Sequence, residues 1–355
     1  MKIDFSIDKL SGGGAERVMV TLANGLSEKH EVRLITFTPE DKYKVSSNVK
    51  RVKLNHKSFK NHTLKSINNL IRYYSQSHKP DILITFMPYN ALIAIVVGLI
   101  LRIDVIVSEH INHTFNKKTK KDLFIQKRFY RFAKHLTVLT KYDIEYFKNM
   151  KANVSVMPNP INIPDDINPF QNRKKQILLV GSLNRIYQKG FDAFLPVIAP
   201  LLKKHEDWKL KILGNGDEGM ALLKKIASEN NITNQVIFAG FCSNIEQEMQ
   251  SSQIFVLPSR HEGLPMGLME ALSNGMACIA YDCISGPSEL IEHETNGLLI
   301  ENQNGKQMFL ELNRLIEDSY LRERLANNSA ESVKKYSLDV ILSKWENLFN
   351  TSNGK

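Results

Sequence analysis

Two carboxylates eight positions apart, Glu262 and Glu270, stand in the stretch 259–272. The glycines and proline between them (263–267) predict a turn that leads into a helix, and the preceding apolar run predicts a buried strand. Glu262 would then lie on the strand-to-helix loop, and backbone N–H groups at the helix start would suit an anion such as a diphosphate. A carboxylate beside such an anion is better suited to sugar hydroxyls than to phosphate. The spacing by itself favours a simpler alternative, in which both glutamates are solvated surface residues.

A basic loop upstream of this stretch could serve the same anion. The apolar segment 176–180 predicts a buried strand, and the loop 181–190 that follows it carries Arg185 and Lys189. A helix is expected from Phe191. Cations on a loop that enters a helix suit a diphosphate, and charges that only face solvent remain the alternative.

The segment 214–219 has the order Gly-x-Gly-x-x-Gly, which can mark a dinucleotide site. Such a site needs an acidic residue about 20 residues further on to hold the ribose. The next predicted strand, 236–238, is followed by alanine and glycine, and the acids inside the motif would repel a pyrophosphate. We therefore interpret Gly214 and Gly216 as part of a turn near a nucleotide, and not as an NAD site.

The N-terminal half opens with a predicted strand, glycine turn, helix and second strand, over residues 2–7, 11–16, 17–26 and 31–37. This order is typical of a parallel α/β domain. The turn contains Gly13 and Gly14 but lacks the order of a dinucleotide fingerprint. It therefore indicates either close approach to a phosphate or a tight turn that needs positive φ.

A histidine follows a later predicted strand of this half. Segments 81–86, 91–101 and 105–108 predict a strand, a buried helix and a strand, and His110 comes just after them. A residue at the carboxyl end of a parallel strand faces the ligand crevice, although a structural role for this histidine is equally compatible with the pattern. Pro88 and the two residues after it interrupt the apolar run, which leaves eleven apolar residues, too few for a transmembrane helix.

Length and composition describe a globular protein of two domains. The 355 residues exceed one comfortable core, and 43% hydrophobic with 24% charged residues is usual. An acidic N-terminus without a signal-peptide core, and three cysteines without CxxC spacing, predict reduced thiols in a cytoplasmic protein. The proline-rich stretch 156–164 is the expected linker between domains 1–164 and 165–336, and 337–355 is expected to form a final helix.

Positive charge is concentrated in the first half of the chain. Residues 1–164 hold 27 lysines and arginines against 13 acids, whereas residues 165–355 hold 20 against 24. The segment 117–136 combines basic residues with apolar ones at helical spacing, a pattern typical of a helix that lies on anionic lipid headgroups or guides an anionic acceptor. An ordinary surface helix remains the alternative, and charge alone leaves nucleic acid, membrane and phosphorylated lipid open as partners.

Taken together, these motifs resemble those of a family-4 retaining glycosyltransferase of the GT-B fold, over nearly the whole chain. The matching segments are Gly-Gly-Ala-Glu at 13–16, Ser-Glu-His at 108–110, Gln-Lys-Gly-Phe-Asp at 188–192 and, most specific, Glu262 to Glu270. The resemblance implies an α/β architecture of two Rossmann-like parallel-sheet domains facing across a cleft, with the final helix crossing back to the first domain. The N-terminal half most resembles enzymes that extend lipid-linked oligosaccharides in bacterial envelope or protein-glycosylation pathways.

The resemblance also implies roles for single residues. Glu270 would hold the nucleotide ribose, Glu262 the hydroxyls of the donor sugar, and Lys189 the phosphate, while His110 would lie near the reacting carbon. The residues expected to bind the donor are Gly13, Gly14, Gly214, Gly216, Gly263, Leu264, Met266 and Glu270.

One departure from the family concerns arginine. The family often has arginine where this chain has Ser182, so Arg185 is the expected replacement. A departing nucleoside diphosphate builds negative charge on its β-phosphate, which Lys189, Arg185 and helix-terminal amides could neutralise without a metal. No Asp-x-Asp motif occurs in the sequence, and neither a metal nor another cofactor is expected.

The expected donor is a UDP-sugar, and the expected acceptor is a polyprenyl-diphosphate-linked oligosaccharide or another envelope glycan. A peripheral position on the inner face of the cell membrane is expected, and nucleic acid is not an expected partner. An epimerase or phosphorylase on the same fold, and a basic lipid- or nucleic-acid-binding protein, remain as alternatives.

Overall fold

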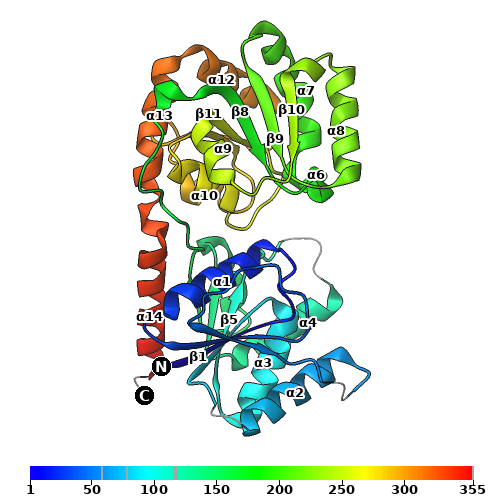
Figure 1. The fold of residues 1–355 in the computed structure, drawn as a ribbon, viewed down its shortest axis with the longest axis vertical. Helices are drawn as coiled ribbons and strands as arrows, with labels where there is room; N and C mark the ends of the chain where they lie inside the picture. The colour runs from blue at the N-terminus through cyan, green and yellow to red at the C-terminus, as the bar shows by residue number, and fades with distance from the viewer. Residues whose placement is uncertain (57–58, 77–78, 115–118, 354–355) are drawn as a thin grey trace. The chain divides into compact units, whose positions relative to one another are not determined.

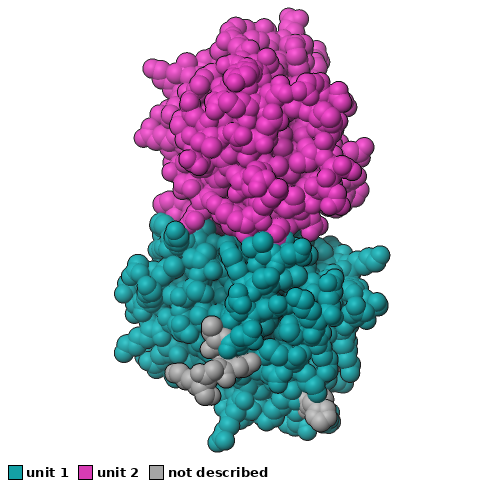
Figure 2. Space-filling model, turned by 90° about the vertical axis from the view of Figure 1, so that its left-hand side faces the viewer, with its two compact units in different colours: residues 1–160, 338–355 teal, residues 161–337 magenta. Residues whose placement is uncertain are grey.

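The computed structural model describes residues 1–56, 59–76, 79–114 and 119–353, and the chain forms two compact units. One unit comprises Met1–Pro160 together with Leu338–Lys355, and the other comprises Ile161–Ser337 (Figures 1 and 2). The first division thus falls within the proline-rich stretch and slightly before the expected boundary. The chain returns to the first unit at residue 338.

The first unit contains a sheet of seven parallel strands within the described residues. The order of the strands in space is β3-β2-β1-β4-β5-β6-β7, so the direction of winding reverses at β1. The strands are β1 Lys2–Ile7, β2 Glu31–Thr36, β3 Val49–Lys53, β4 Ile82–Phe86, β5 Asp104–Glu109, β6 His135–Val138 and β7 Val154–Val156. Because all of them run the same way, the loops after β1, β4 and β5 meet at one edge of the sheet.

Apolar runs predicted most of these strands. The expected strands at 2–7, 31–37, 81–86 and 105–108 are confirmed as β1, β2, β4 and β5. The edge strand β3 has no counterpart among the predicted strands. Its sequence, Val-Lys-Arg-Val-Lys, is only partly buried and lacks the continuous apolar run that marks an interior parallel strand.

A buried helix follows β4. The helices of the first unit are α1 Gly14–Leu26, α2 His62–Gln76, α3 Pro88–Leu101, α4 Lys120–Phe129, α5 Ile144–Lys148 and α14 Leu338–Asn353. The apolar run is divided at Pro88, as expected, but α3 begins at Pro88 itself, three residues before the expected start at residue 91, because proline is compatible with the first helical position, where the N–H has no partner within the helix. Over the described ranges, no helix is both long and apolar enough to cross a membrane.

The segment 117–136 does not form one continuous helix. Lys117 and Lys118 lie outside the described residues, and α4 ends at Phe129. A short 3-10 helix, Tyr130–Phe132, and the strand β6 follow it. The helical spacing of apolar residues across the whole segment therefore does not correspond to one helical face.

The apolar residues of this segment divide between core and surface. On the apolar side expected from the helical spacing, Ile125, Ala133 and Leu136 are buried, whereas Phe132 is 47% exposed. Phe124, which is not on that side, is 57% exposed. The expected apolar side is thus only partly buried, because the chain leaves the helical path before the predicted pattern is complete. The two exposed phenylalanines lie among basic residues.

The final helix α14 packs on α1 within the first unit (Figure 1). Trp345 and Phe349 are each only 1% exposed. A Cβ added to Gly25 of α1 would lie 2.6 Å from a methyl group of Leu342, so glycine allows the two helices to approach closely. The last helix is therefore part of the core of the unit that contains the N-terminus.

The second unit contains six parallel strands in the order β10-β9-β8-β11-β12-β13 within the described part of the chain. The strands are β8 Lys174–Val180, β9 Lys209–Leu213, β10 Val236–Gly240, β11 Ser252–Leu257, β12 Ala277–Tyr281 and β13 Leu298–Ile300. The helices are α6 Ile186–Lys189, α7 Phe191–Lys204, α8 Asp217–Glu229, α9 Ile245–Ser251, α10 Met266–Ser273, α11 Pro287–Leu290, α12 Gly305–Glu317 and α13 Ser319–Ser332. The winding reverses at β8, and in open parallel sheets ligands bind at the carboxyl edge next to such a reversal.

Candidate active site

An ion pair joins two loops at the carboxyl edge of the second sheet. Lys189, at the end of α6, donates from Nζ to Oε1 of Glu262 over 2.8 Å. Ser259, which is fully buried, donates its hydroxyl to the same oxygen over 2.6 Å. Glu262 is 8% exposed and the Lys189 side chain 16% exposed, so the pair is largely shielded from bulk water. The two residues that the sequence placed on separate loops are thus brought into direct contact.

The backbone around Glu262 is also fixed. Its N–H donates to the carbonyl of Ile284 over 2.9 Å, and its own carbonyl accepts from the N–H of Ser285 over 3.0 Å. The Ser285 hydroxyl donates to the carbonyl of Gly263 over 3.2 Å. Burial raises the pKa of the neighbouring Cys283 thiol, and the negative charge of Glu262 raises it further, so this thiol stays neutral. The backbone of the Glu262 loop is therefore held by the loop that follows the adjacent strand β12.

Close backbone contacts explain two of the glycines. Gly190 has φ +69°, and a Cβ there would lie 1.9 Å from the carbonyl oxygen of Pro258. Gly214 has φ +153°, and a Cβ there would lie 1.8 Å from the carbonyl oxygen of Gly181. Any larger residue would push apart the loops that follow β8, β9 and β11.

The Gly-x-Gly-x-x-Gly segment packs against the loop after β8. A Cβ on Gly216 would lie 2.5 Å from the backbone nitrogen of Asn184. The N–H of Leu183 donates to the carbonyl of Asn215 over 2.8 Å. Both glycines predicted to bind the donor, Gly214 and Gly216, therefore have a packing role, supporting the loop that leads to Lys189.

Helix α10 carries the second glutamate of the motif. Pro265 stands just before α10, and its carbonyl accepts from the N–H groups of Leu268 and Met269. Leu264 is buried, at 5% exposure, and anchors the loop. The N–H of Met266 belongs to the first turn, where amides have no partner within the helix. Glu270 follows in the second turn and is half-buried.

The two arginines near this edge differ in their surroundings. Arg185, the predicted phosphate ligand, is exposed in a 3-10 turn just before α6. Arg260 was not predicted, although it stands inside the motif stretch. It donates to both carboxylate oxygens of Asp192, over 2.8 and 3.0 Å, and to the carbonyl of Tyr187. The hydrogen bond to Asp192 raises the pKa of Arg260, which joins the Glu262 loop to α6 and α7.

His110 lies in the first unit, just after β5. Its ring stacks on Phe86 with centroids 4.2 Å apart, and Nε2 lies 3.3 Å from the Ser108 hydroxyl. Thr137 donates its hydroxyl to Ser108 over 2.8 Å, which leaves the Ser108 proton available for the ring nitrogen. Burial lowers the pKa of His110 to about 3, so the ring is neutral near pH 7. Such a ring can donate or accept a hydrogen bond but carries no charge.

The residue before it, Glu109, ties α4 to the same strand end. Its carboxylate accepts from Gln126 over 2.9 Å and from the hydroxyl of Tyr130. Glu109 is only 2% exposed, and both partners are fully buried. The helix that carries much of the basic segment is thus anchored beside His110.

The glycine loop of the first unit is organised by Glu16. The N–H groups of Gly12 and Gly13 donate to Oε2 of Glu16, over 2.8 and 3.2 Å. A Cβ on Gly14 would meet no atom within 4 Å, so this position faces open space. Of the two glycines predicted to approach the donor, Gly13 has its N–H already bonded, and Gly14 borders free volume.

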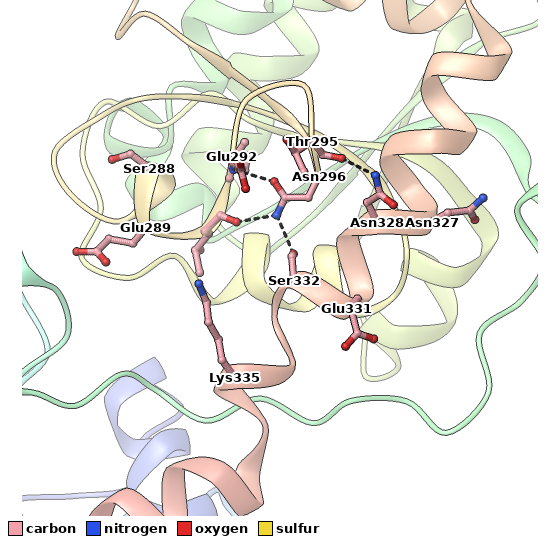
Figure 3. Close-up of a pocket in the computed structure, with 12 residues that line it drawn as sticks. Ser288, Glu289, Glu292, Thr295, Asn296, Asn327, Asn328, Glu331, Ser332 and Lys335 are labelled. Atoms are coloured by element: carbon pink, nitrogen blue, oxygen red, sulfur yellow. Dashed lines mark hydrogen bonds between the residues drawn. The ribbon is translucent and has the colours of Figure 1, made fainter.

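A polar pocket elsewhere in the second unit does not match a diphosphate. Figure 3 shows it, with a volume of about 770 Å³, between the segment 288–296 and the end of α13. Its lining includes three carboxylates and one lysine: Glu289, Glu292, Glu331 and Lys335. Asn296 is already bonded to Leu290 and Ser332. The negative charge disfavours a phosphate, and none of the predicted site residues lines the pocket.

The structure thus assembles the predicted residues as two sets. Lys189 and Glu262 touch, and the other residues of the second unit's set lie on loops or the first two helical turns at the same sheet edge: Arg185, Gly214, Gly216, Gly263, Leu264, Met266 and Glu270. His110, Gly13 and Gly14 belong to the first unit. In the described part of the chain, no group of three or more His, Cys, Asp or Glu residues could hold a metal ion.

We expect Gly190→Ala to destabilise the second unit. The positive φ alone costs about 1–3 kcal/mol for a residue with a Cβ, and the overlap with the Pro258 carbonyl adds to that cost. Gly14→Ala is the matched control, because its Cβ would point into open space. Urea unfolding of the purified variants measures the difference, and equal midpoints for both would contradict the close contact.

We expect His110 to lower the free energy of unfolding as the pH falls. Its pKa is lowered in the folded state, so below about pH 6.5 the unfolded chain gains a proton that the folded chain does not. Stability should therefore fall with pH, by up to about 1.4 kcal/mol per unit between about pH 6.5 and 3. Between about pH 7 and 5, the free energy of unfolding of His110→Phe should fall by about 2 kcal/mol less than that of the wild type. The exposed His56→Phe serves as control, and identical losses in both variants would refute the assignment.

Comparison with protein families matches both halves of the chain. The family described as "Glycosyltransferase Family 4" matches residues 12–164, and "Glycosyl transferases group 1" matches residues 163–332. An uncharacterized glycosyltransferase of Haemophilus influenzae is 30% identical, with 98% of this chain and 99% of that protein covered. The structure of Anabaena HepE in complex with UDP has the same fold, with a TM-score of 0.82 and 16% identity over 99% of this chain and 100% of that one.

A second relative has a more specific name. It is the GalNAc-alpha-(1->4)-GalNAc-alpha-(1->3)-diNAcBac-PP-undecaprenol alpha-1,4-N-acetyl-D-galactosaminyltransferase of Campylobacter jejuni, 29% identical with 97% of each chain covered. The family matches, the full-length relative and the two parallel-sheet units agree with one another. The chain is a glycosyltransferase of the family-4 type with the GT-B fold.

Proposed function

We propose that this glycosyltransferase moves a hexose or N-acetylhexosamine from a UDP-sugar to a lipid-linked oligosaccharide or another cell-envelope glycan, with retention and without a metal. The observation that carries the proposal is the shielded 2.8 Å pair of Lys189 and Glu262 at the carboxyl edge beside the reversal at β8. A lysine ammonium has three N–H donors, so Lys189 can hold Glu262 and still donate to a phosphate.

The charges suit the departure of a nucleoside diphosphate. The bond between C1 of the sugar and the β-phosphate oxygen breaks, and the electron pair stays on the phosphate. Lys189, the exposed Arg185 and the first amides of α10 would neutralise that charge. The acceptor hydroxyl oxygen forms the new bond to C1 on the same face and passes its proton to a phosphate oxygen. Glu262 would hold the sugar hydroxyls and Glu270 the ribose.

The choice of UDP and of an envelope acceptor draws on similar proteins. HepE, which shares the fold, was solved with UDP, and the Campylobacter relative is named for an undecaprenol-linked acceptor. His110 would face the reacting carbon as a neutral ring, which avoids repulsion of a developing positive charge at C1. These points support a UDP-sugar donor and a polyprenyl-diphosphate-linked acceptor for this chain.

We expect Lys189→Ala and Glu262→Ala each to lower turnover by about 10²–10³, as loss of one preorganised charge stabiliser does. The measurement is UDP release from a panel of UDP-sugars, with and without lipid-linked acceptor. UDP binding, read as thermal stabilisation, should fall in Lys189→Ala. Lys203→Ala, which removes an exposed lysine of α7, is the matched control.

Two outcomes would reject this proposal. Near wild-type UDP release by both variants would show that the pair is not part of the site. Release of free UDP at full rate without acceptor would favour an epimerase on the same fold.

We further propose that the enzyme is cytoplasmic and binds the inner face of the cell membrane through α4 and the turn after it. Lys120, Lys127 and Arg128 are exposed there, next to the exposed rings of Phe124 and Phe132. Basic side chains attract anionic lipid headgroups, and exposed aromatic rings insert at the interface. The net positive charge of residues 1–164 acts in the same direction.

Charge reversal of Lys120, Lys127 and Arg128 to glutamate should weaken binding to anionic vesicles at least tenfold, since each basic residue contributes about 1 kcal/mol near such a surface. Sedimentation with vesicles of phosphatidylglycerol and phosphatidylcholine measures the effect. The same reversal at three exposed lysines of the second unit, Lys203, Lys224 and Lys225, controls for net charge. Equal loss in both variants, or no loss in the first, would remove the membrane role of α4.

A further inference from the structure

Four polar side chains from separate elements of the first unit form a cluster that has no part in the site described above. The hydroxyl of Tyr89 lies 2.7 Å from Nδ1 of His62, and Nε2 of His62 lies 3.4 Å from Oδ1 of Asp8. The ammonium of Lys121 lies over the Tyr89 ring, 4.8 Å from its centroid. The cluster therefore joins the loop after β1 to the starts of α2, α3 and α4.

The cluster lies at the same sheet edge as His110. Asp8 directly follows β1, Tyr89 is in the first turn of α3 after β4, and His110 follows β5. β1, β4 and β5 are neighbours in the sheet, so β1 lies about 10 Å from β5, two strand spacings away. A ligand the size of a sugar residue that reached this cluster would also come near His110.

The backbone holds these side chains firmly. The Asp8 carbonyl accepts from the N–H groups of Phe37 and Thr38, each over 3.0 Å. Met87, between β4 and α3, has φ +72° and ψ 148°, a conformation that is costly for a residue with a Cβ. This sharp turn allows α3 to begin directly at the strand end and places Tyr89 beside His62. Strain of this kind tends to collect at functional sites.

Among the described residues, the hydrogen bonds of the cluster leave both donors and acceptors available for a ligand. If Nε2 of His62 carries the proton toward Asp8, Nδ1 accepts from the Tyr89 hydroxyl. Thr63 donates to the same hydroxyl over 3.2 Å. Desolvation raises the pKa of Tyr89, and the charge of Asp8 adds to this, so the ring stays a phenol. The second carboxylate oxygen of Asp8 can accept, and Lys121 can donate.

The cluster combines a carboxylate with an ammonium, and this combination suits the sugar part of a glycolipid acceptor better than its diphosphate part. A sugar hydroxyl both donates and accepts, so it can bond to a carboxylate and an ammonium together. A diphosphate only accepts, and Asp8 would repel it. The Asp8 side chain is 32% exposed and that of His62 40% exposed, so a solute can reach them. The chemistry therefore favours a neutral, hydroxyl-rich ligand.

We propose that Asp8, His62, Tyr89 and Lys121 form a binding site for a sugar residue of the acceptor, positioned beside His110. This inference rests on the proposed function, because it takes the first unit to bind a glycan acceptor. Tyr89 and Asp8 contact the sugar, and His62 acts as a positioning residue that orients Tyr89.

The test uses the full chain and free N-acetylgalactosamine as the probe, observed by saturation-transfer difference NMR. The wild type should bind the sugar in the millimolar range, and Tyr89→Phe, Asp8→Asn and Lys121→Met should each weaken binding about five- to tenfold, as loss of one hydrogen bond does. His56→Gln and Tyr142→Phe are matched controls, since neither side chain belongs to the cluster. Glu262→Ala should retain the sugar signal, which separates this site from the donor site.

Several outcomes would overturn the proposal: no sugar binding by the wild type, equal binding by wild type and cluster variants, or loss of the signal in Glu262→Ala. Inorganic pyrophosphate is the second probe, and binding of pyrophosphate that the cluster variants lose would assign the cluster to a diphosphate instead.

Thermal stabilisation by UDP is measured on the same samples. If UDP fails to stabilise the wild type, the proposed function fails. If UDP stabilises the wild type but the sugar does not bind, only this inference fails. The result for Asp8→Asn counts only if this variant unfolds at the same temperature as the wild type. If it does not, the result for Tyr89→Phe decides.

Discussion

The loops that follow β8, β9 and β11 touch at two points where only glycine leaves enough room. The carbonyl oxygens of Pro258 and Gly181 lie less than 2 Å from where a Cβ on Gly190 or Gly214 would stand. Three loops are therefore in contact backbone to backbone, and their spacing cannot change without moving the strands. Lys189 and Glu262, 73 positions apart in the chain, meet because these loops meet. The ion pair is thus a consequence of backbone packing that glycine alone permits.

Burial decides the electrostatics of both units. A carboxylate as buried as Glu262 is costly unless it is paired, and Lys189 and Ser259 both donate to it. The second unit consequently holds the Lys189 ammonium in a fixed position. In the first unit, burial removes the charge of His110 instead. The carboxyl edge of the second sheet thus presents a fixed ion pair, and that of the first sheet presents a neutral ring.

The sequence predicted what depends on local pattern. Interior strands such as β1, β4 and β8 are apolar runs, and glycine and proline marked the turns that follow several of them. The basic edge strand β3 has no such run and was not predicted, and the predicted helix over 117–136 is wrong because its C-terminal part forms a 3-10 turn and the start of β6. Arg260 and the cluster around Tyr89 could not be predicted, because their partners come from other elements: Asp192 in one case, Asp8 and His62 in the other.

This chain has Ser182 where the family often has arginine, and two nearby arginines, Arg185 and Arg260, could replace it. Arg260 lies at the carboxyl edge of the second sheet, but its guanidinium donates to both oxygens of Asp192 and to the backbone of Tyr187. To bind a phosphate it would have to leave a bidentate ion pair, whose hydrogen bonds are among the strongest in proteins. Arg185 is exposed and one turn away from Lys189 along the chain, so it can move without breaking such a pair. Arg260 is therefore better explained as a structural clamp, and under the function proposed above Arg185 is the arginine that would serve a diphosphate.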